Sequence, residues 1–240
     1  MNKVFSLAAI LFWTFGGTDS FEKNIYKSKA FDIESGAFLY IERHIEEYSG
    51  NGIEKSTTEY LNLNGIPIAR RIMNFSVDST KPNFKLEDFR TGYLEGAELI
   101  TPGKVKVEHR ADINSKLETE IVKVEEPYVI DGGLTYFFRR NWNSLFNNKT
   151  VEFNFIVPSK LDYFGFRVSK NSIKNINGIK GMELKLEPSS FIIRQFVDPI
   201  FITYDLETKK ILYYEGLSNI NNDEGKSYNV RIDFTNEEFN

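Results

Sequence analysis

The sequence predicts a mainly β protein in which a large, curved antiparallel sheet, a half-barrel, wraps around one main amphipathic helix. Many short runs alternate apolar and polar residues and are separated by turn residues, which is typical of antiparallel strands. One segment instead repeats its apolar residues with the period of a helix. Aromatic residues make up 15% of the chain, and a wide concave sheet face needs large side chains to fill it.

Residues 1–20 resemble a secretory signal peptide. Lys3 is followed by a largely apolar run from residue 4 to residue 15, which is shorter than the roughly 20 residues that a membrane-spanning helix needs. Small residues suitable for cleavage follow this run. We therefore expect a signal peptide at 1–20 and a single antiparallel half-barrel domain at 21–240, exported to the bacterial periplasm. A buried N-terminal strand and an uncleaved anchor are the alternatives.

The composition excludes several kinds of chemistry. The chain has no cysteine, which excludes disulfides, thiol catalysis, thiolate metal sites and an acylated lipoprotein anchor. Two histidines leave little for imidazole chemistry, and a formal net charge of -4 gives no overall attraction to nucleic acid. We therefore expect no cofactor, no metal, no nucleic-acid partner and no enzymatic activity.

The first half of the chain contains a predicted meander of strands. From residue 37 to residue 45, one phase of the alternation is apolar, with Leu39 and Ile41, and the other is largely polar, with Glu42 and His44. We expect the apolar phase to be buried and the polar phase to face solvent, where His44 forms a surface pair with a neighbouring glutamate. Glycine residues then turn the chain. Further strands are expected at 57–63, 66–77, 104–110 and 117–124.

The second half repeats the pattern with cleaner alternation. Val151, Phe153 and Phe155 alternate with polar residues, so the strand is expected to bury one face and expose the other. A polar turn predicts a hairpin between residues 200–204 and 211–215. The other predicted strands are at 151–157, 164–168, 182–186 and 228–234.

The segment from Leu134 to Phe146 is the predicted main helix. Its apolar residues are spaced i, i+3, i+4, i+8, i+11 and i+12, which gives an aromatic stripe along one face. Asp131 is expected to cap the N-terminus of this helix. A shorter helical turn is expected at 189–196, after Pro188.

This organisation resembles a known family. A leader, a run of antiparallel strands, one amphipathic helix after Asp131-Gly132-Gly133 and the hairpin from Tyr204 to Gly216 look like the half-barrel fold of periplasmic lipoprotein-carrier proteins. The chain from about residue 132 to residue 234 also resembles uncharacterised bacterial envelope proteins of the same architecture. In the carrier family the concave apolar face holds acyl chains, so the resemblance implies a lipid or an acylated protein as partner. We also expect peripheral contact with the outer membrane.

The candidate ligand-binding residues lie on the predicted helix and beside it. The helix stripe is expected to face an apolar cavity enclosed by the sheet, and a solid core without a cavity is the alternative. Arg139 and Arg194 are candidates for holding a ligand head group, because a planar guanidinium suits carboxylate and phosphate. An ion pair between an arginine and Asp198 is the alternative. The stripe consists of Leu134, Phe137, Phe138, Trp142 and Phe146.

The expected function is that of a non-catalytic, exported envelope protein that binds an apolar ligand in the half-barrel cavity. Two other classes remain open: a structural or adaptor protein that binds partners through sheet edges, and a hydrolase of envelope glycans or lipids that uses carboxylates from different strands. Residues 216–220 contain only half of a nucleophile elbow. His109 follows the phase of buried valines and is expected to be a hydrogen-bonded core or edge residue. The sequence does not indicate the oligomeric state.

Overall fold

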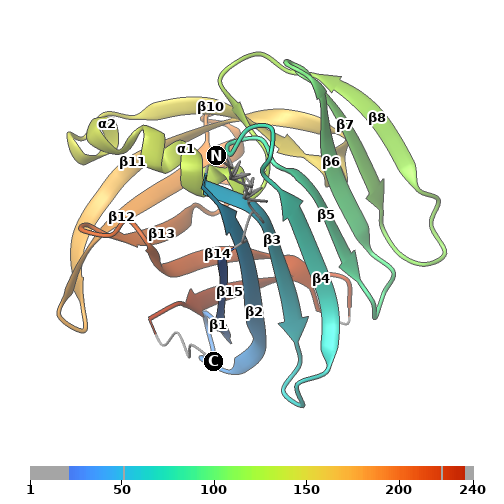
Figure 1. The fold of residues 1–240 in the computed structure, drawn as a ribbon, viewed down its shortest axis with the longest axis horizontal. Coiled ribbons are helices and arrows are strands. Elements are labelled where there is room, and N and C mark those ends of the chain that lie inside the picture. Colours follow the sequence, from blue (N-terminus) through green and yellow to red (C-terminus); the bar gives the residue numbers. More distant parts are fainter. Residues whose placement is uncertain (1–21, 51, 223, 236–240) are drawn as a thin grey trace, which may run out of the picture.

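The computed structural model describes residues 22–50, 52–222 and 224–235, and the predicted signal peptide at 1–20 lies outside them. Within the described residues, 15 strands form one sheet in the order β8-β7-β6-β5-β4-β3-β2-β1-β15-β14-β13-β12-β11-β10-β9. The sheet curls to leave a concave inner face (Figure 1). The predicted fold class, mainly β with a large curved antiparallel sheet, is confirmed.

The N-terminal half of the chain is a meander in which each strand pairs antiparallel with the next. Glycine residues close several of its turns, and Gly65 and Gly103 both have a φ of 76°, a left-handed conformation that glycine adopts without steric cost. The strands are β1 (Glu22–Asp32), β2 (Phe38–Ser49), β3 (Gly52–Leu61), β4 (Pro67–Asn74), β5 (Asn83–Asp88), β6 (Leu94–Thr101), β7 (Lys104–Arg110) and β8 (Glu118–Lys123).

The C-terminal half contains the helices and the remaining strands. The short strand β9 pairs parallel with β10, and the later strands form a second antiparallel meander. The elements are β9 (Tyr128–Val129), α1 (Gly133–Arg140), α2 (Trp142–Phe146), β10 (Val151–Val157), η1 (Pro158–Lys160), β11 (Asp162–Ile176), β12 (Ile179–Pro188), η2 (Ile193–Gln195), β13 (Ile200–Asp205), β14 (Ile211–Asn221) and β15 (Ser227–Asp233).

One pair of strands joins the two meanders. β1 pairs antiparallel with β15, with Ala30 opposite Ile232 and Asp32 opposite Val230. This pairing places the first and last described strands side by side in the middle of the sheet, and leaves β8 and β9 at its two edges. The N-terminal and C-terminal meanders therefore become the two walls of one curved sheet (Figure 1).

The predicted single helix is two short helices, which corrects the sequence prediction. α1 and α2 are separated at Asn141, whose φ of -97° and ψ of 11° depart from helical geometry. The side chain of Asn141 donates from Nδ2 to the carbonyl oxygen of Phe137 at 2.9 Å, which competes with the helical backbone pattern. Asp131 does not cap α1: the residue at the cap position is Gly132, with no side-chain cap hydrogen bond.

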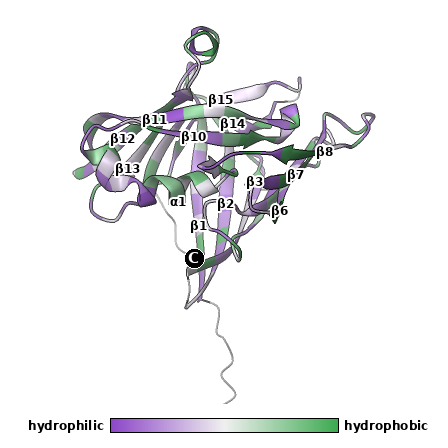
Figure 2. Cartoon of the chain, turned by 90° about the horizontal axis from the view of Figure 1, so that it is seen from above, coloured by the Kyte–Doolittle hydropathy of each residue, from purple (hydrophilic) through white to green (hydrophobic). Residues whose placement is uncertain are grey.

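The predicted inward and outward phases of β2 are reversed in the structure. Tyr40, Glu42 and His44 are buried, whereas Leu39 and Ile41 are only partly buried. Apolar and polar residues alternate along the strands, as the hydropathy colouring shows (Figure 2). In β2, however, the phase that contains Glu42 and His44 faces the concave side. The alternation was predicted correctly, but not the face that each phase occupies.

The aromatic stripe packs α1 and α2 against the C-terminal wall of the sheet. Phe138 is fully buried, and its ring centroid lies 6.4 Å from that of Phe153 and 6.3 Å from that of Tyr204. Trp142 meets Tyr204 edge-on at 6.1 Å. Gly133, at the start of α1, lies so close to the backbone of Thr80 that any Cβ would overlap it. The helix pair is therefore held in the concave side of the sheet.

We expect Phe138→Ala to lower the free energy of unfolding by about 3–5 kcal/mol, because it removes a ring from a closely packed site. Phe146→Ala is the matched control, since 47% of Phe146 is exposed; its loss should stay under about 1 kcal/mol. Urea unfolding followed by circular dichroism measures both. Equal losses for the two variants would show that the stripe is not packed as described.

Candidate ligand cavity

A cavity of about 620 Å³ lies between the concave face of the sheet and the helix α1. α1 contributes Leu134, Thr135, Tyr136 and Arg139 to its wall, and the rest of the wall comes mainly from the strands of both meanders. The volume falls within the roughly 300–1,000 Å³ that is usual for small-molecule sites.

The C-terminal meander supplies an apolar wall. Partly buried side chains such as Phe155 and Phe166 pack against the core on one side and line the cavity on the other. The sequence predicts that β10 buries one phase only, but Phe153 and Ile156, which lie in opposite phases, are both buried because the strand packs against two apolar clusters. The apolar lining residues of this half include Phe155, Phe166, Leu186, Ile200, Ile202, Ile211 and Ile232.

The N-terminal meander supplies a polar wall, in which Glu42 and His44 form one cluster. Ser28 Oγ donates to Glu42 Oε2 at 3.2 Å, and His44 Nε2 lies 3.2 Å from the same oxygen. Thr58 Oγ1 lies 3.2 Å from His44 Nδ1, and the His44 ring stacks on Tyr26 at 4.6 Å between centroids. The predicted pairing of His44 with a glutamate is present, but inside the protein and not on its surface.

A second polar cluster contains Arg71, Asp131 and Glu95. Arg71 Nη1 donates to Asp131 Oδ1 at 3.1 Å. Burial opposes the charged guanidinium, but the nearby Asp131 carboxylate raises the pKa of Arg71 above its usual value. Arg71 Nε is buried and has no hydrogen-bond partner among the described residues. Asp131 thus acts as the ion-pair partner of a cavity residue, whereas the sequence suggested a helix cap.

Burial also perturbs Glu95, which lies beside this ion pair on β6. Desolvation raises the pKa of Glu95 to about 7, although Tyr93 donates a hydrogen bond to its Oε2 at 2.9 Å. The Asp131 carboxylate raises this pKa further, and Arg71 lowers it. The charge of the polar wall therefore changes near neutral pH.

Buried hydroxyl groups connect the polar wall to β14. Tyr40 and Ser218 share a hydrogen bond of 2.7 Å between their hydroxyls, and Tyr60 donates to Asn219 Oδ1 at 3.0 Å. Ser218 lies within β14 and contacts a tyrosine, so residues 216–220 form no nucleophile elbow. These hydroxyl groups satisfy one another or an amide in pairs, as buried polar groups require.

The predicted site residues are placed at three different depths. Leu134 lines the cavity. Phe137, Phe138 and Trp142 are buried in the core against the C-terminal wall and are not among the lining residues. Phe146 is half-exposed, with Lys170 Nζ 5.2 Å from its ring centroid. The helix therefore supplies one apolar side chain of the predicted stripe to the cavity, and the others hold the helix in place.

The two predicted head-group arginines make hydrogen bonds to the backbone. Arg139 lines the cavity, and its Nε and Nη2 donate to the carbonyl oxygen of Lys209 at 3.1 and 3.0 Å. Arg194 Nη1 donates to the carbonyl oxygens of Pro188 and Ser189 at 2.9 and 2.8 Å, and not to Asp198, the ion-pair partner that the sequence offered as the alternative. Arg194 is not among the residues that line the cavity.

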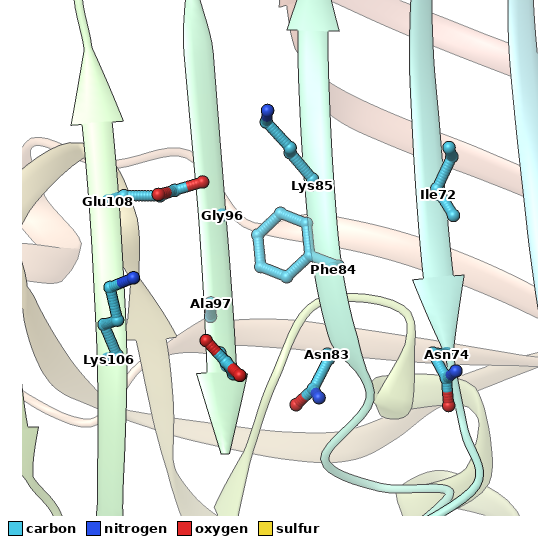
Figure 3. A pocket seen from close by; sticks show the side chains of 10 residues that line it. Ile72, Asn74, Asn83, Phe84, Lys85, Gly96, Ala97, Lys106 and Glu108 are labelled. Atoms are coloured by element: carbon cyan, nitrogen blue, oxygen red, sulfur yellow. The ribbon is translucent and has the colours of Figure 1, made fainter. Parts of the chain in front are cut away.

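Sequence analysis missed Arg71, Glu95 and the inward orientation of Glu42. One signal was present: Arg71 shares the strand phase of the apolar Ala69 and Met73, which are both buried in β4, and this phase places the arginine on the inner face. A second hollow of about 360 Å³ lies around Gly96, between the side chains of Lys85 and Glu108 (Figure 3). It is smaller than the cavity described above.

No protein-family model matches the chain, and no curated protein matches it. Among solved structures, it is similar to a β-barrel-like protein of the domain of unknown function DUF1849 from Brucella abortus, with a TM-score of 0.52 and 12% identity, covering 91% of this chain and 97% of that one. A DUF1329 family protein from Desulfovibrio piger has a TM-score of 0.29 and 9% identity, covering 93% of this chain and 87% of that one, which supports no argument. The first similarity supports a barrel-like fold alone.

Among the described residues, no group of three or more histidine, aspartate and glutamate side chains is placed to hold a metal ion. Nor does the described part of the chain contain a helix that is long and apolar enough to cross a membrane.

We expect the stability of the protein to fall as the pH rises from about 4.5 to about 7, because the folded state keeps Glu95 protonated where the unfolded chain does not. The full cost, on the order of 3 kcal/mol, is present above the folded pKa. Glu95→Gln should remove this loss, since it stays neutral and still accepts from Tyr93. Urea unfolding of the variant and the wild type across this pH range measures the difference.

Glu98→Gln on the same strand is the control, because Glu98 is exposed. Its stability should follow the wild-type pH dependence. Parallel curves for Glu95→Gln and the wild type would contradict the inward, desolvated position of Glu95.

Proposed function

We propose that this protein is a non-catalytic, exported envelope protein that receives an apolar ligand, a lipid or the acyl chain of an acylated protein, in the cavity between its sheet and α1. The observation that carries this proposal is the size of the cavity together with the mainly apolar wall that the C-terminal meander supplies. The leader-like residues 1–20 support export to the periplasm.

The free energies of apolar burial and of association favour a cavity that exists before the ligand enters. Burying about 12 methylene groups yields roughly 10 kcal/mol at about 0.8 kcal/mol each, while association costs on the order of 4–15 kcal/mol. A useful affinity therefore requires that little further energy is spent on opening the core. The cavity of about 620 Å³ between the sheet and α1 supports this requirement.

The polar wall favours binding over catalysis. Glu42 with His44, and Arg71 with Asp131, are paired with each other. The Ser28 hydroxyl lies 3.1 Å from His44 Nε2, but Ser28 is buried and is not among the residues that line the cavity, so a ligand in the cavity does not meet it. An amphipathic ligand fits two such walls, with its hydrocarbon part against Phe155 and its neighbours.

We expect Leu134→Trp to lower the affinity for an apolar fluorescent probe by about tenfold or more, because the larger ring projects from α1 into the cavity and takes up ligand volume. Probe titration gives the affinity, and mass spectrometry of lipids extracted from the purified protein gives the natural ligand. Leu63→Trp is the control, since Leu63 is exposed at a turn.

Circular dichroism checks that both variants are folded. The proposal is wrong if the wild-type protein neither binds the probe nor carries any extracted lipid. It is also wrong if Leu134→Trp binds the probe as tightly as Leu63→Trp.

A further inference from the structure

The connection between β12 and β13 exposes a continuous set of large apolar side chains. The exposed fractions are 70% for Phe191, 72% for Ile192 and 83% for Phe196, and Ile193 and Val197 are exposed as well. We call residues 189–197 the apolar loop. Single exposed apolar residues are common on proteins, but five within seven consecutive positions form a patch that indicates an interaction surface.

The apolar loop lies where the cavity opens. Pro188, just before the loop, and Val197, at its end, both line the cavity. Val197 and Leu217 line the cavity and are also exposed to solvent, so the cavity meets the surface beside the loop. Gly216, next to Leu217, is packed directly against Ile200, which places the β13 and β14 sides of this opening together.

The backbone of the apolar loop satisfies much of its own hydrogen bonding. The N–H groups of Arg194, Gln195 and Phe196 donate to carbonyl oxygens within the loop, at 3.0 to 3.2 Å. Ser189 N donates to the carbonyl oxygen of Gly165 at 2.8 Å. A segment that enters a bilayer needs such internal pairing, because hydrocarbon offers no partners to backbone groups.

Arg194 is the one charged residue of the apolar loop. Its guanidinium is held at the base of the loop by the carbonyl oxygens of Pro188 and Ser189, and it lies 5.7 Å from the centre of the Phe191 ring. In a bilayer the lipid phosphate groups lie outside the hydrocarbon. An arginine at the base of an apolar loop suits this arrangement, because the arginine can lie at the level of the phosphates while the apolar side chains enter the hydrocarbon.

We infer that the apolar loop inserts into the surface of a lipid bilayer and places the cavity opening against it, so that the ligand passes between bilayer and cavity without crossing water. This inference rests on the proposed function, because it assumes an apolar ligand. A protein partner is the competing occupant. The loop carries no carboxylate and a single arginine that is already hydrogen-bonded, and three of its backbone N–H groups are paired within the loop, which favours hydrocarbon over a polar protein surface.

The test is sedimentation of the exported protein with vesicles of phosphatidylcholine. The double variant Phe191→Ser, Phe196→Ser should reduce the partition coefficient by about tenfold or more, since two large aromatic side chains leave the hydrocarbon. Raising the salt concentration should change wild-type binding little, because the loop has only one charge. The control Leu63→Ser, Ile113→Ser removes exposed apolar residues from turns elsewhere and should bind as the wild type does. All variants share one N-terminus, so residues 1–20 cannot cause the difference.

A second measurement reports the position of the loop directly. Phe196→Trp should shift its fluorescence emission to the blue when vesicles are added, and brominated lipids should quench it. Trp142 in the wild type is buried and should change little. An unshifted emission, a wild type that does not sediment with vesicles, or a double variant that sediments like the wild type would overturn the inference.

Probe binding without vesicles separates this inference from the proposed function. If the wild type binds the apolar probe but not the vesicles, the loop inference fails and the cavity function stands. If the protein binds vesicles through the loop but takes up no probe, the cavity function fails and membrane docking stands alone. The double variant should bind the probe as tightly as the wild type, because Phe191 and Phe196 do not line the cavity.

Discussion

The pairing of β1 with β15 is the constraint on which the rest of the architecture depends. The other antiparallel pairs of the described sheet join strands that follow each other along the chain, and such local pairs close at small entropic cost. The β1–β15 pair instead brings Ala30 opposite Ile232. Without it, the two meanders would be separate sheets with open edges. With it, they form one curved sheet with a common concave face.

Joining two unlike meanders produces a cavity with two unlike walls. The N-terminal meander turns Glu42, His44 and Arg71 inward, whereas the C-terminal meander turns mainly apolar side chains inward. Buried polar groups are costly unless they are paired, and here the pairs cross between strands, as in Tyr60 with Asn219. These hydrogen bonds fix the two walls relative to each other on either side of the cavity. α1 covers the cavity, and most residues of the aromatic stripe pack against the core and do not line the cavity.

The agreement between sequence and structure was uneven for physical reasons. Strand positions in the C-terminal half followed the alternation closely, because apolar residues at every second position of β11, β12 and β13 pack into one core. β1 and β6 were not predicted, since their mixed sequences have little apolar alternation to detect. β5 was not predicted either, although Phe84 and Leu86 alternate with charged residues, because the alternation covers only six residues. The helix stripe was located correctly, but Asn141 divides the helix in two. Asp131 forms an ion pair with Arg71 and does not cap the helix. A side chain that can cap a helix can equally neutralise a buried cation, and local sequence does not distinguish the two.

The sequence by itself determined the class of the fold, since a two-residue period bounded by turn residues is a local property that leaves little choice but antiparallel strands. Only the tertiary structure decided which phase of each strand faces inward. Polarity marks the outer face of a strand when the inner face packs into a solid core. Along β2 and β4 the inner face lines a cavity, where Glu42 and Arg71 find partners on other elements. In β2 the polar phase can therefore be the buried one, and in β4 a charged side chain can lie on the inner face between Ala69 and Met73.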